Sequence, residues 1–134
     1  MKRAAVKTVL SNTGYKAQSN ARGQMIEMDR PIVDGGENTA PTPIEYLLAA
    51  IGGCVSMTIR VYANQVGWSL GEVTVNVFQK NKLTSKGLTT ILIEEISFEN
   101  EVTQEQKQQL LIVASECPVA KLLKGETQIQ SEIV

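Results

Sequence analysis

The sequence predicts an α+β fold built from antiparallel strands and one long helix. Three observations support this class: short alternating segments before residue 30, a long apolar helical stretch after residue 42, and two alternating segments after residue 71. Short turns separate the neighbouring strands, and only antiparallel strands can be joined in this way. A chain of 134 residues fits one domain, which we expect to span residues 1–134.

Composition and charge exclude several classes of function. The chain is 43% hydrophobic and 20% charged, with a net charge of −1, so it lacks the basic excess expected for nucleic acid or an anionic membrane. No run approaches the roughly 20 apolar residues of a membrane span, and Lys7 interrupts the short apolar run at the N-terminus. We therefore expect a cytoplasmic protein with no membrane or nucleic-acid partner.

The first 43 residues predict a three-stranded meander and a loop. Extended segments cover residues 4–11, 15–21 and 24–29, with turn signals at residues 12–14 and 22–23. Residues 30–43 then hold three of the four prolines and a Gly-Gly pair. A loop of this length suggests a functional or interface role.

A long helix is expected next, from Pro43 to about Asn64. Thr42 fits the N-cap, Pro43 the first helical position, and Glu45 the third position of a capping box. Apolar and small residues surround most of the helix, so it should be buried on several sides. The residues that keep a helical spacing are Leu47, Leu48, Ile51, Val55, Thr58, Ile59 and Tyr62, and the small residues that would admit another backbone are Ala49, Ala50, Gly52 and Gly53.

The next segments predict a hairpin. A strand over residues 72–80 is followed by a loop over residues 81–87 and a second strand over residues 88–99. The second strand changes its apolar parity between Ile93 and Ile96. Either a bulge near Glu94 and Glu95 or burial on both faces would explain this change.

Two helices and a final strand complete the prediction. Thr103 and Gln106 form a capping box for a helix with Leu110, Leu111 and Ala114 inward. Pro118 then opens a short helix over residues 118–124, which Gly125 ends. Residues 127–134 alternate and predict a strand.

The candidate chemistry rests on two cysteines. The chain has no histidine, which excludes Cys-His and Ser-His catalysis and histidine-bearing metal sites; Cys54 and Cys117 stand 63 positions apart, which is neither a CxxC nor a zinc motif. We expect no metal and no cofactor. Cys54 is either a small core residue or a reactive thiol. Cys117 is either an incidental loop residue or an N-cap thiol whose pKa the helix N-terminus lowers.

Together the two cysteines are compatible with a redox cycle. One thiolate attacks a peroxide and becomes a sulfenic acid, which the other thiol converts to a disulfide. An external dithiol reductant would then reopen the disulfide. The cycle requires the two sulfurs to meet, which spacing in a sequence does not establish.

Three stretches resemble the OsmC/Ohr family: "DRPIVDGGENTAPTP", "TPIEYLLAAIGGCVSMTIR" and "ECPVAKLLKG". The resemblance covers most of the chain in order. It implies antiparallel sheets around a long central helix, an intertwined homodimer whose two long helices pack together, and reduction of organic hydroperoxides and hydrogen peroxide. By position, Cys54 would be the peroxidatic cysteine and Cys117 the resolving cysteine.

The resemblance also implies a glutamate and an arginine at the site. Glu45 matches the glutamate, although it also suits a helix start. Arg22 and Arg30 are the candidates for the arginine, with Arg30 preferred because its loop leads to the cysteine helix; each also fits a solvated surface position. Glu45 and Cys54 lie nine residues apart, hence on opposite faces of a regular helix and about 13 Å apart along its axis. Glu45 would therefore serve the cysteine of the other subunit.

The chain departs from the hydroperoxide reductases in two places. Their glutamate lies one position further from the first cysteine, and "VSM" replaces the aromatic residues that often follow that cysteine. These departures place the chain in a broader OsmC-like group. The alternative function is a non-catalytic dimer that binds an apolar small molecule in an interface pocket lined by Leu48, Ile51 and Met57, with Cys54 merely packed; a third is a purely structural dimer.

Overall fold

The computed structural model describes residues 3–134 in two compact units. The first unit ends at Leu47 and the second runs from Leu48 to Val134, so the division falls within the long helix α1 (Pro43–Val66). The first two residues of the expected domain lie outside the described residues. The single domain over residues 1–134 stays a prediction.

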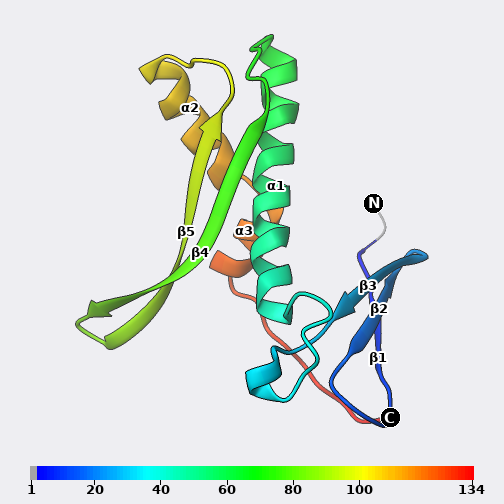
Figure 1. Cartoon of the computed structure of the whole chain (residues 1–134). Coiled ribbons are helices and arrows are strands. Elements are labelled where there is room, and N and C mark those ends of the chain that lie inside the picture. Colours follow the sequence, from blue (N-terminus) through cyan, green and yellow to red (C-terminus); the bar gives the residue numbers. More distant parts are fainter. Residues whose placement is uncertain (1–2) are drawn as a thin grey trace. The chain divides into compact units, whose positions relative to one another are not determined.

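The first unit is the expected meander. Strands β1 (Lys7–Leu10), β2 (Ala17–Ala21) and β3 (Gln24–Met28) pair antiparallel in the order β1-β2-β3 (Figure 1). Arg22 and Gly23 form the two-residue turn between β2 and β3, with φ of 54° and 85°. Left-handed conformations at both turn positions match the twist of the flanking strands. The loop after β3 contains one short 3-10 helix, η1 (Ile32–Asp34).

Helix α1 starts with the predicted capping box. The Glu45 carboxylate accepts the Thr42 backbone N–H at 2.9 Å, and the Thr42 hydroxyl accepts the Glu45 N–H at 3.2 Å. The helix continues two residues beyond the predicted end, and Gly67 follows it with φ of 77°. Its buried residues are Ile51, Val55, Ile59 and Ala63.

By length and composition alone, α1 could also cross a membrane. The helix has 24 residues, and its most apolar window has a mean hydropathy of 1.4. Of the residues in this window, 17% are buried within the single chain. The apolar stretch is thus longer than the sequence reading assumed. The core helix of a soluble protein can have the same length and hydropathy, so these two quantities do not identify a membrane span. The expectation that the protein has no membrane partner stays a prediction.

The predicted hairpin forms with a shorter loop than expected. Strands β4 (Val73–Thr84) and β5 (Gly87–Phe98) leave only two residues between them, and the seven-residue loop is wrong. The Thr84 hydroxyl donates to the Gly87 carbonyl at 3.0 Å and accepts the Lys86 N–H at 3.2 Å. These side-chain bonds, with Gly87 at φ of 99°, close a tight turn that polar residues alone did not reveal.

The hairpin register decides between the two explanations of the parity change in β5. Pairing runs without interruption from Val73 opposite Phe98 to Thr84 opposite Gly87, so there is no bulge. Because side chains alternate along a strand, Ile91 and Ile93 lie on one face, while Ile96 and Phe98 lie on the other. All four are partly buried, which agrees with burial on both faces.

Two helices follow the hairpin. Helix α2 (Gln104–Ser115) has the predicted capping box, and α3 (Pro118–Lys124) has the predicted bounds. Leu110 and Ala114 are buried as expected, but Leu111 is 65% exposed, so its inward placement is wrong. The buried face also includes Val113, and Leu111 lies about 100° from Leu110 around the helix.

The core belongs to the second unit. It brings together the inner faces of α1 and α2 with Leu70 and Cys117, and residues of β4 and β5 pack against it. The buried hydrophobic residues are Ile51, Val55, Ile59, Ala63, Leu70, Leu110, Val113, Ala114 and Cys117.

The predicted C-terminal strand does not form. Residues 125–134 have neither helix nor strand, and Ile129 and Ile133 are 90% and 103% exposed. A strand is stable only beside a hydrogen-bonding neighbour, and none of the strands in residues 3–134 pairs with this segment. The alternating pattern of residues 127–134 therefore did not suffice to predict a strand.

Candidate functional site: a pair of thiols

The fold brings Cys54 and Cys117 into contact within the second unit. Cys54 lies in the middle of α1, next to buried Val55, and Cys117 lies at the junction between α2 and α3. The Cys117 thiol forms a hydrogen bond with Cys54, and both thiols are free. Two residues far apart in sequence therefore meet, as the redox cycle requires.

The two thiols differ in access to solvent. Cys117 is 0% exposed and belongs to the hydrophobic core, whereas Cys54 is partly exposed and packs against that core. A peroxide from solution can therefore reach Cys54 more readily than Cys117. Cys54 packs against the core without being fully buried, so its two alternatives, a packed small residue and a reactive thiol, stay predictions.

The electrostatics of Cys117 are opposite to the expectation from its place at a helix N-terminus. Burial is the main cause that raises its pKa above the ordinary value of 9.0, and the hydrogen bond to Cys54 raises it further. Hydrogen bonds from the backbone N–H groups of Ala120 and Val119 lower it, but they do not compensate. The predicted lowering of this pKa is therefore wrong, because desolvation outweighs the helix terminus.

This arrangement gives the thiols separate roles. A thiol with a raised pKa stays protonated at neutral pH and donates its hydrogen bond to the neighbouring sulfur. Cys54 is the sulfur that solvent reaches, since it is only partly buried. Cys54 is thus suited to attack and Cys117 to wait as a thiol.

Glu45 belongs to the first unit and caps α1. Its side chain is exposed and accepts the Thr42 N–H, which is the helix-start role considered above. This contact uses one carboxylate oxygen, and the other oxygen remains available for a further hydrogen bond. Its service to a cysteine of a second subunit stays a prediction.

Arg22 and Arg30 lie at opposite ends of β3. Arg22 is in the β2–β3 turn, and Arg30 follows the other end of the strand, so eight extended residues hold them roughly 25 Å apart. They cannot act together on one small substrate. The Arg30 guanidinium lies over the Tyr15 ring, 5.0 Å from its centroid.

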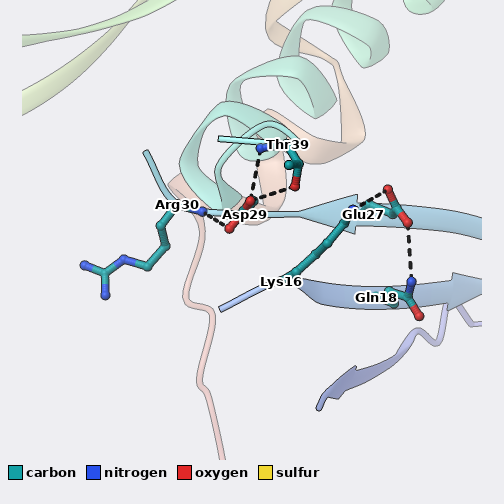
Figure 2. Close-up of polar contacts among 6 residues, drawn as sticks. All are labelled: Lys16, Gln18, Glu27, Asp29, Arg30 and Thr39. Atoms are coloured by element: carbon teal, nitrogen blue, oxygen red, sulfur yellow. Dashed lines mark hydrogen bonds and ion pairs between the residues drawn. The ribbon is translucent and has the colours of Figure 1, made fainter. Parts of the chain in front are cut away.

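The carboxylates nearest to Arg30 in sequence are engaged elsewhere. Glu27 pairs with the Lys16 ammonium at 3.5 Å and accepts the Gln18 amide at 3.3 Å (Figure 2). Asp29 accepts the Arg30 backbone N–H at 2.7 Å, and in Figure 2 the Arg30 side chain extends away from it. Within residues 3–134, no carboxylate forms an ion pair with Arg30.

Asp29 is a structural residue that sequence reasoning missed. It is 2% exposed and accepts both the backbone N–H of Thr39 at 3.0 Å and its hydroxyl at 2.7 Å (Figure 2). The Thr39 hydroxyl is the leading cause that lowers the Asp29 pKa to about 2. Asp29 thereby ties the end of β3 to the far end of the loop. An acidic residue before a proline-rich loop is too common a pattern to have predicted this.

The two central glycines of α1 differ in their surroundings. A Cβ on Gly52 would lie 3.5 Å from a Val77 methyl and 3.6 Å from the Val75 carbonyl, so Gly52 packs against the hairpin. A Cβ on Gly53 would meet nothing within 4 Å. One glycine is thus explained by contact within the chain, and the other faces an open side of α1.

The second unit also contains an open groove of about 530 Å³ between β5, α2 and α3. Apolar side chains dominate its lining, including Ile51, Leu92, Ile96 and Leu123. Leu48 and Met57 do not line it, so the expected interface pocket stays a prediction. Over the part of the chain that the structure describes, no three His, Cys, Asp or Glu side chains are grouped to hold a metal ion.

Comparison with known proteins assigns the family. Residues 36–132 match the family described as OsmC-like protein, and the chain belongs to this family. The matched range contains both cysteines and Glu45, whereas Arg22 and Arg30 precede it. Among curated proteins, none matches the chain significantly.

Solved structures share the fold at low identity. An organic hydroperoxide resistance protein OsmC from Legionella pneumophila, described as a predicted redox protein, is 21% identical, with a TM-score of 0.69 over 93% of this chain and 91% of the other. OhrB of Bacillus subtilis, an organic hydroperoxide resistance protein, is 17% identical, with a TM-score of 0.62 and 93% of each chain covered.

A third similar structure has no assigned function. This OsmC-like protein from Vibrio cholerae is 18% identical, with a TM-score of 0.71 and 100% of each chain covered. The three structures establish the α+β fold with antiparallel sheets and a long central helix. The fold is thus shared by hydroperoxide resistance proteins and by proteins of unknown function.

Proposed function

We propose that this protein reduces organic hydroperoxides and hydrogen peroxide through Cys54 and Cys117. The Cys54 thiolate attacks the terminal peroxide oxygen, the O–O bond breaks, and the alkoxide takes a proton to leave as an alcohol. Cys54 is thereby oxidised to a sulfenic acid. The Cys117 sulfur then displaces hydroxide from this sulfenic acid, which releases water and forms the disulfide. An external dithiol supplies two electrons and two protons to restore both thiols.

The observation that carries this proposal is the contact between one accessible and one buried thiol. Cys54 is partly exposed and receives a hydrogen bond from Cys117, which is 0% exposed. The buried thiol is protected from peroxide until the sulfenic acid forms beside it.

The surroundings of the thiols favour an organic peroxide. Cys117 is part of the hydrophobic core, and Val119 and Ala120 pack against the same core. An alkyl or aryl group gains from contact with such a surface, whereas hydrogen peroxide does not. We therefore expect higher kcat/KM for cumene hydroperoxide than for hydrogen peroxide.

The proposal includes a homodimer in the cytoplasm. On the open side of α1, Gly53 has space for a side chain, and Met57 and Val61 are 70% and 58% exposed. These residues follow a helical stripe of small and apolar side chains that a second α1 could cover. Across such an interface, Glu45 of one subunit would serve Cys54 of the other.

Arg30 is the proposed arginine of the site. Its guanidinium has no carboxylate partner within the described part of the chain and carries donors suited to peroxide oxygens. Arg22 sits at an exposed hairpin turn and serves as the matched control. We expect Arg30→Gln to lower kcat/KM by roughly 100-fold and Arg22→Gln to leave it unchanged.

The central experiment counts free thiols after excess cumene hydroperoxide. The reduced protein should lose both thiols, and Cys117→Ser should accumulate a sulfenic acid on Cys54 that dimedone traps. Cys54→Ser is the control and should keep Cys117 reduced. Thiols that survive excess peroxide in the unmodified protein would refute the proposal.

Mixed dimers test the position of Glu45. A Cys54→Ser subunit retains Glu45, and a Glu45→Gln subunit retains Cys54. If the glutamate acts on the other subunit, mixing the two inactive proteins restores one complete site per mixed dimer and part of the activity. Unrestored activity in a verified mixed dimer would show that Glu45 does not act across the interface.

The second candidate function is binding of an apolar small molecule without catalysis. The groove of about 530 Å³ in the second unit is the observation that favours it, since Ile51, Leu92 and Leu123 line it. Native mass spectrometry of the purified protein should then detect a bound hydrophobic molecule. Peroxide-inert thiols together with such a ligand would favour this function over the peroxidase.

A further inference from the structure

The Tyr15 ring lies under the Arg30 guanidinium. Tyr15 comes from the segment before β2, whereas Arg30 follows β3, and the guanidinium lies 5.0 Å from the centroid of the Tyr15 ring. The Tyr15 ring also lies beside Gly35 in the loop, since a Cβ added at Gly35 would be 3.4 Å from Tyr15 Cε2. The ring thus touches both the arginine and the turn that ends η1.

The backbone of Arg30 is held from two sides. Its N–H donates to the Asp29 carboxylate at 2.7 Å, and its carbonyl accepts the Asn38 N–H at 3.0 Å. Gly36 passes so close that a Cβ there would lie 2.1 Å from the Arg30 carbonyl oxygen. Together with Tyr15, these contacts restrain both ends of the arginine side chain.

A ring restrains a guanidinium without neutralising it. A carboxylate partner would occupy the N–H donors of Arg30 and cancel its charge, whereas an aromatic face leaves the donors at the edge of the guanidinium free. Glu27 is already paired with Lys16 and Gln18, and Asp29 with Thr39. The charge of Arg30 therefore remains available for an anionic or polar oxygen ligand.

We infer that Tyr15 is a positioning residue, whose ring holds the Arg30 guanidinium in the conformation that receives the peroxide oxygens. This inference rests on the proposed function, in which Arg30 is the arginine of the site. Tyr15 does not touch the reacting atoms. It reduces the freedom that Arg30 would otherwise lose when substrate binds.

Kinetics of five proteins test the inference: the unmodified protein, Tyr15→Leu, Tyr15→Phe, Arg30→Gln and the double variant of Tyr15→Leu with Arg30→Gln. With cumene hydroperoxide, Tyr15→Leu should lower kcat/KM about 2- to 5-fold, while Tyr15→Phe, which keeps the ring, should stay near the unmodified value. In an Arg30→Gln background, Tyr15→Leu should have no further effect. An equal loss with and without Arg30 would mean that Tyr15 acts on the fold and not through the arginine, and would overturn the inference.

Side-chain NMR provides a readout that does not depend on activity. The Arg30 Nε–H heteronuclear NOE should indicate a restrained guanidinium in the unmodified protein and in Tyr15→Phe, and a mobile one in Tyr15→Leu. An unchanged NOE in Tyr15→Leu would overturn the inference whatever the kinetics. Full activity of Arg30→Gln would instead overturn the proposed role of Arg30, even where the NOE still shows that Tyr15 restrains it.

Discussion

The two compact units are held together by different interactions. In the first, the buried residues are polar: Ser19, whose hydroxyl bonds Thr8 at 2.7 Å, and Asp29, which ties the loop to β3. In the second, the buried residues are hydrophobic and come from α1, the segment after it, α2 and the α2–α3 junction. Apolar burial supplies most folding free energy, so the second unit has its own core.

The difference agrees with the location of the two thiols in the second unit. A thiol pair needs a fixed, partly dry environment, and the hydrophobic unit supplies it around Cys117. The first unit leaves apolar side chains such as Val9, Leu10 and Met25 more than half exposed. The second unit exposes apolar side chains as well, with Met57 and Leu111 at 70% and 65%. The two units therefore differ in the residues that they bury, and not in the apolar side chains that they expose.

The largest expected effect is a cavity in the core of the second unit. Ile59 is 0% exposed, and Ile59→Ala should lower the free energy of unfolding by about 2–5 kcal/mol, measured by urea at constant protein concentration. Met25→Ala, at a residue 59% exposed in the first unit, is the control and should change it by less than about 0.5 kcal/mol. Equal losses would contradict the contrast between the units.

A second prediction concerns the open side of α1. The Cβ that Gly53→Leu adds meets nothing within 4 Å, so the chain should still fold, but a second α1 packed there would be displaced. Overpacking of about 1–3 kcal/mol should raise the dimer dissociation constant roughly tenfold, measured by analytical ultracentrifugation. Gln65→Leu, exposed and about 120° around the helix, is the control. An unchanged constant in Gly53→Leu would place the interface elsewhere.

A smaller effect is expected at the helix caps, where the two units use the same motif. Thr103→Ala removes the cap of α2 and should cost about 1 kcal/mol of unfolding free energy, because the Gln106 N–H loses its acceptor. Thr42→Ala should cost a similar amount at the start of α1. Serine substitutions keep the hydroxyl and should stay near the unmodified stability. A clear difference between the two losses would show that tertiary context decides how much each cap contributes to the free energy of unfolding.

The smallest effect at neutral pH is the titration of Asp29. Its pKa of about 2 lies below the ordinary value of 3.8, so its hydrogen bonds stabilise the loop above pH 4. This contribution should fade as the pH falls from about 4 to about 2, followed by the Asp29 carboxyl carbon and the Thr39 amide in NMR spectra. Asp29→Asn should remove this acid transition. A carboxyl that titrates near 3.8 would disprove the clamp.

Local signals in the sequence determined most of the secondary structure. Thr42 and Glu45, Thr103 and Gln106, and Pro118 act within a few residues of themselves, and the predicted helix starts are correct for that reason. The motif around the two cysteines likewise led to the family, which the match over residues 36–132 confirms. Alternation misled at residues 127–134, because a strand depends on a neighbour that the pattern does not specify.

By itself, then, the sequence determined the fold class, the helix starts and the identity of the candidate thiols. Only the tertiary structure decided that Cys54 and Cys117 touch, and that Cys117 has a raised pKa despite standing at a helix N-terminus. It also decided that Tyr15 and Asp29 hold Arg30. The physical reason is range: caps and turns act over a few residues, whereas burial, desolvation and contacts across the fold depend on groups distant in sequence.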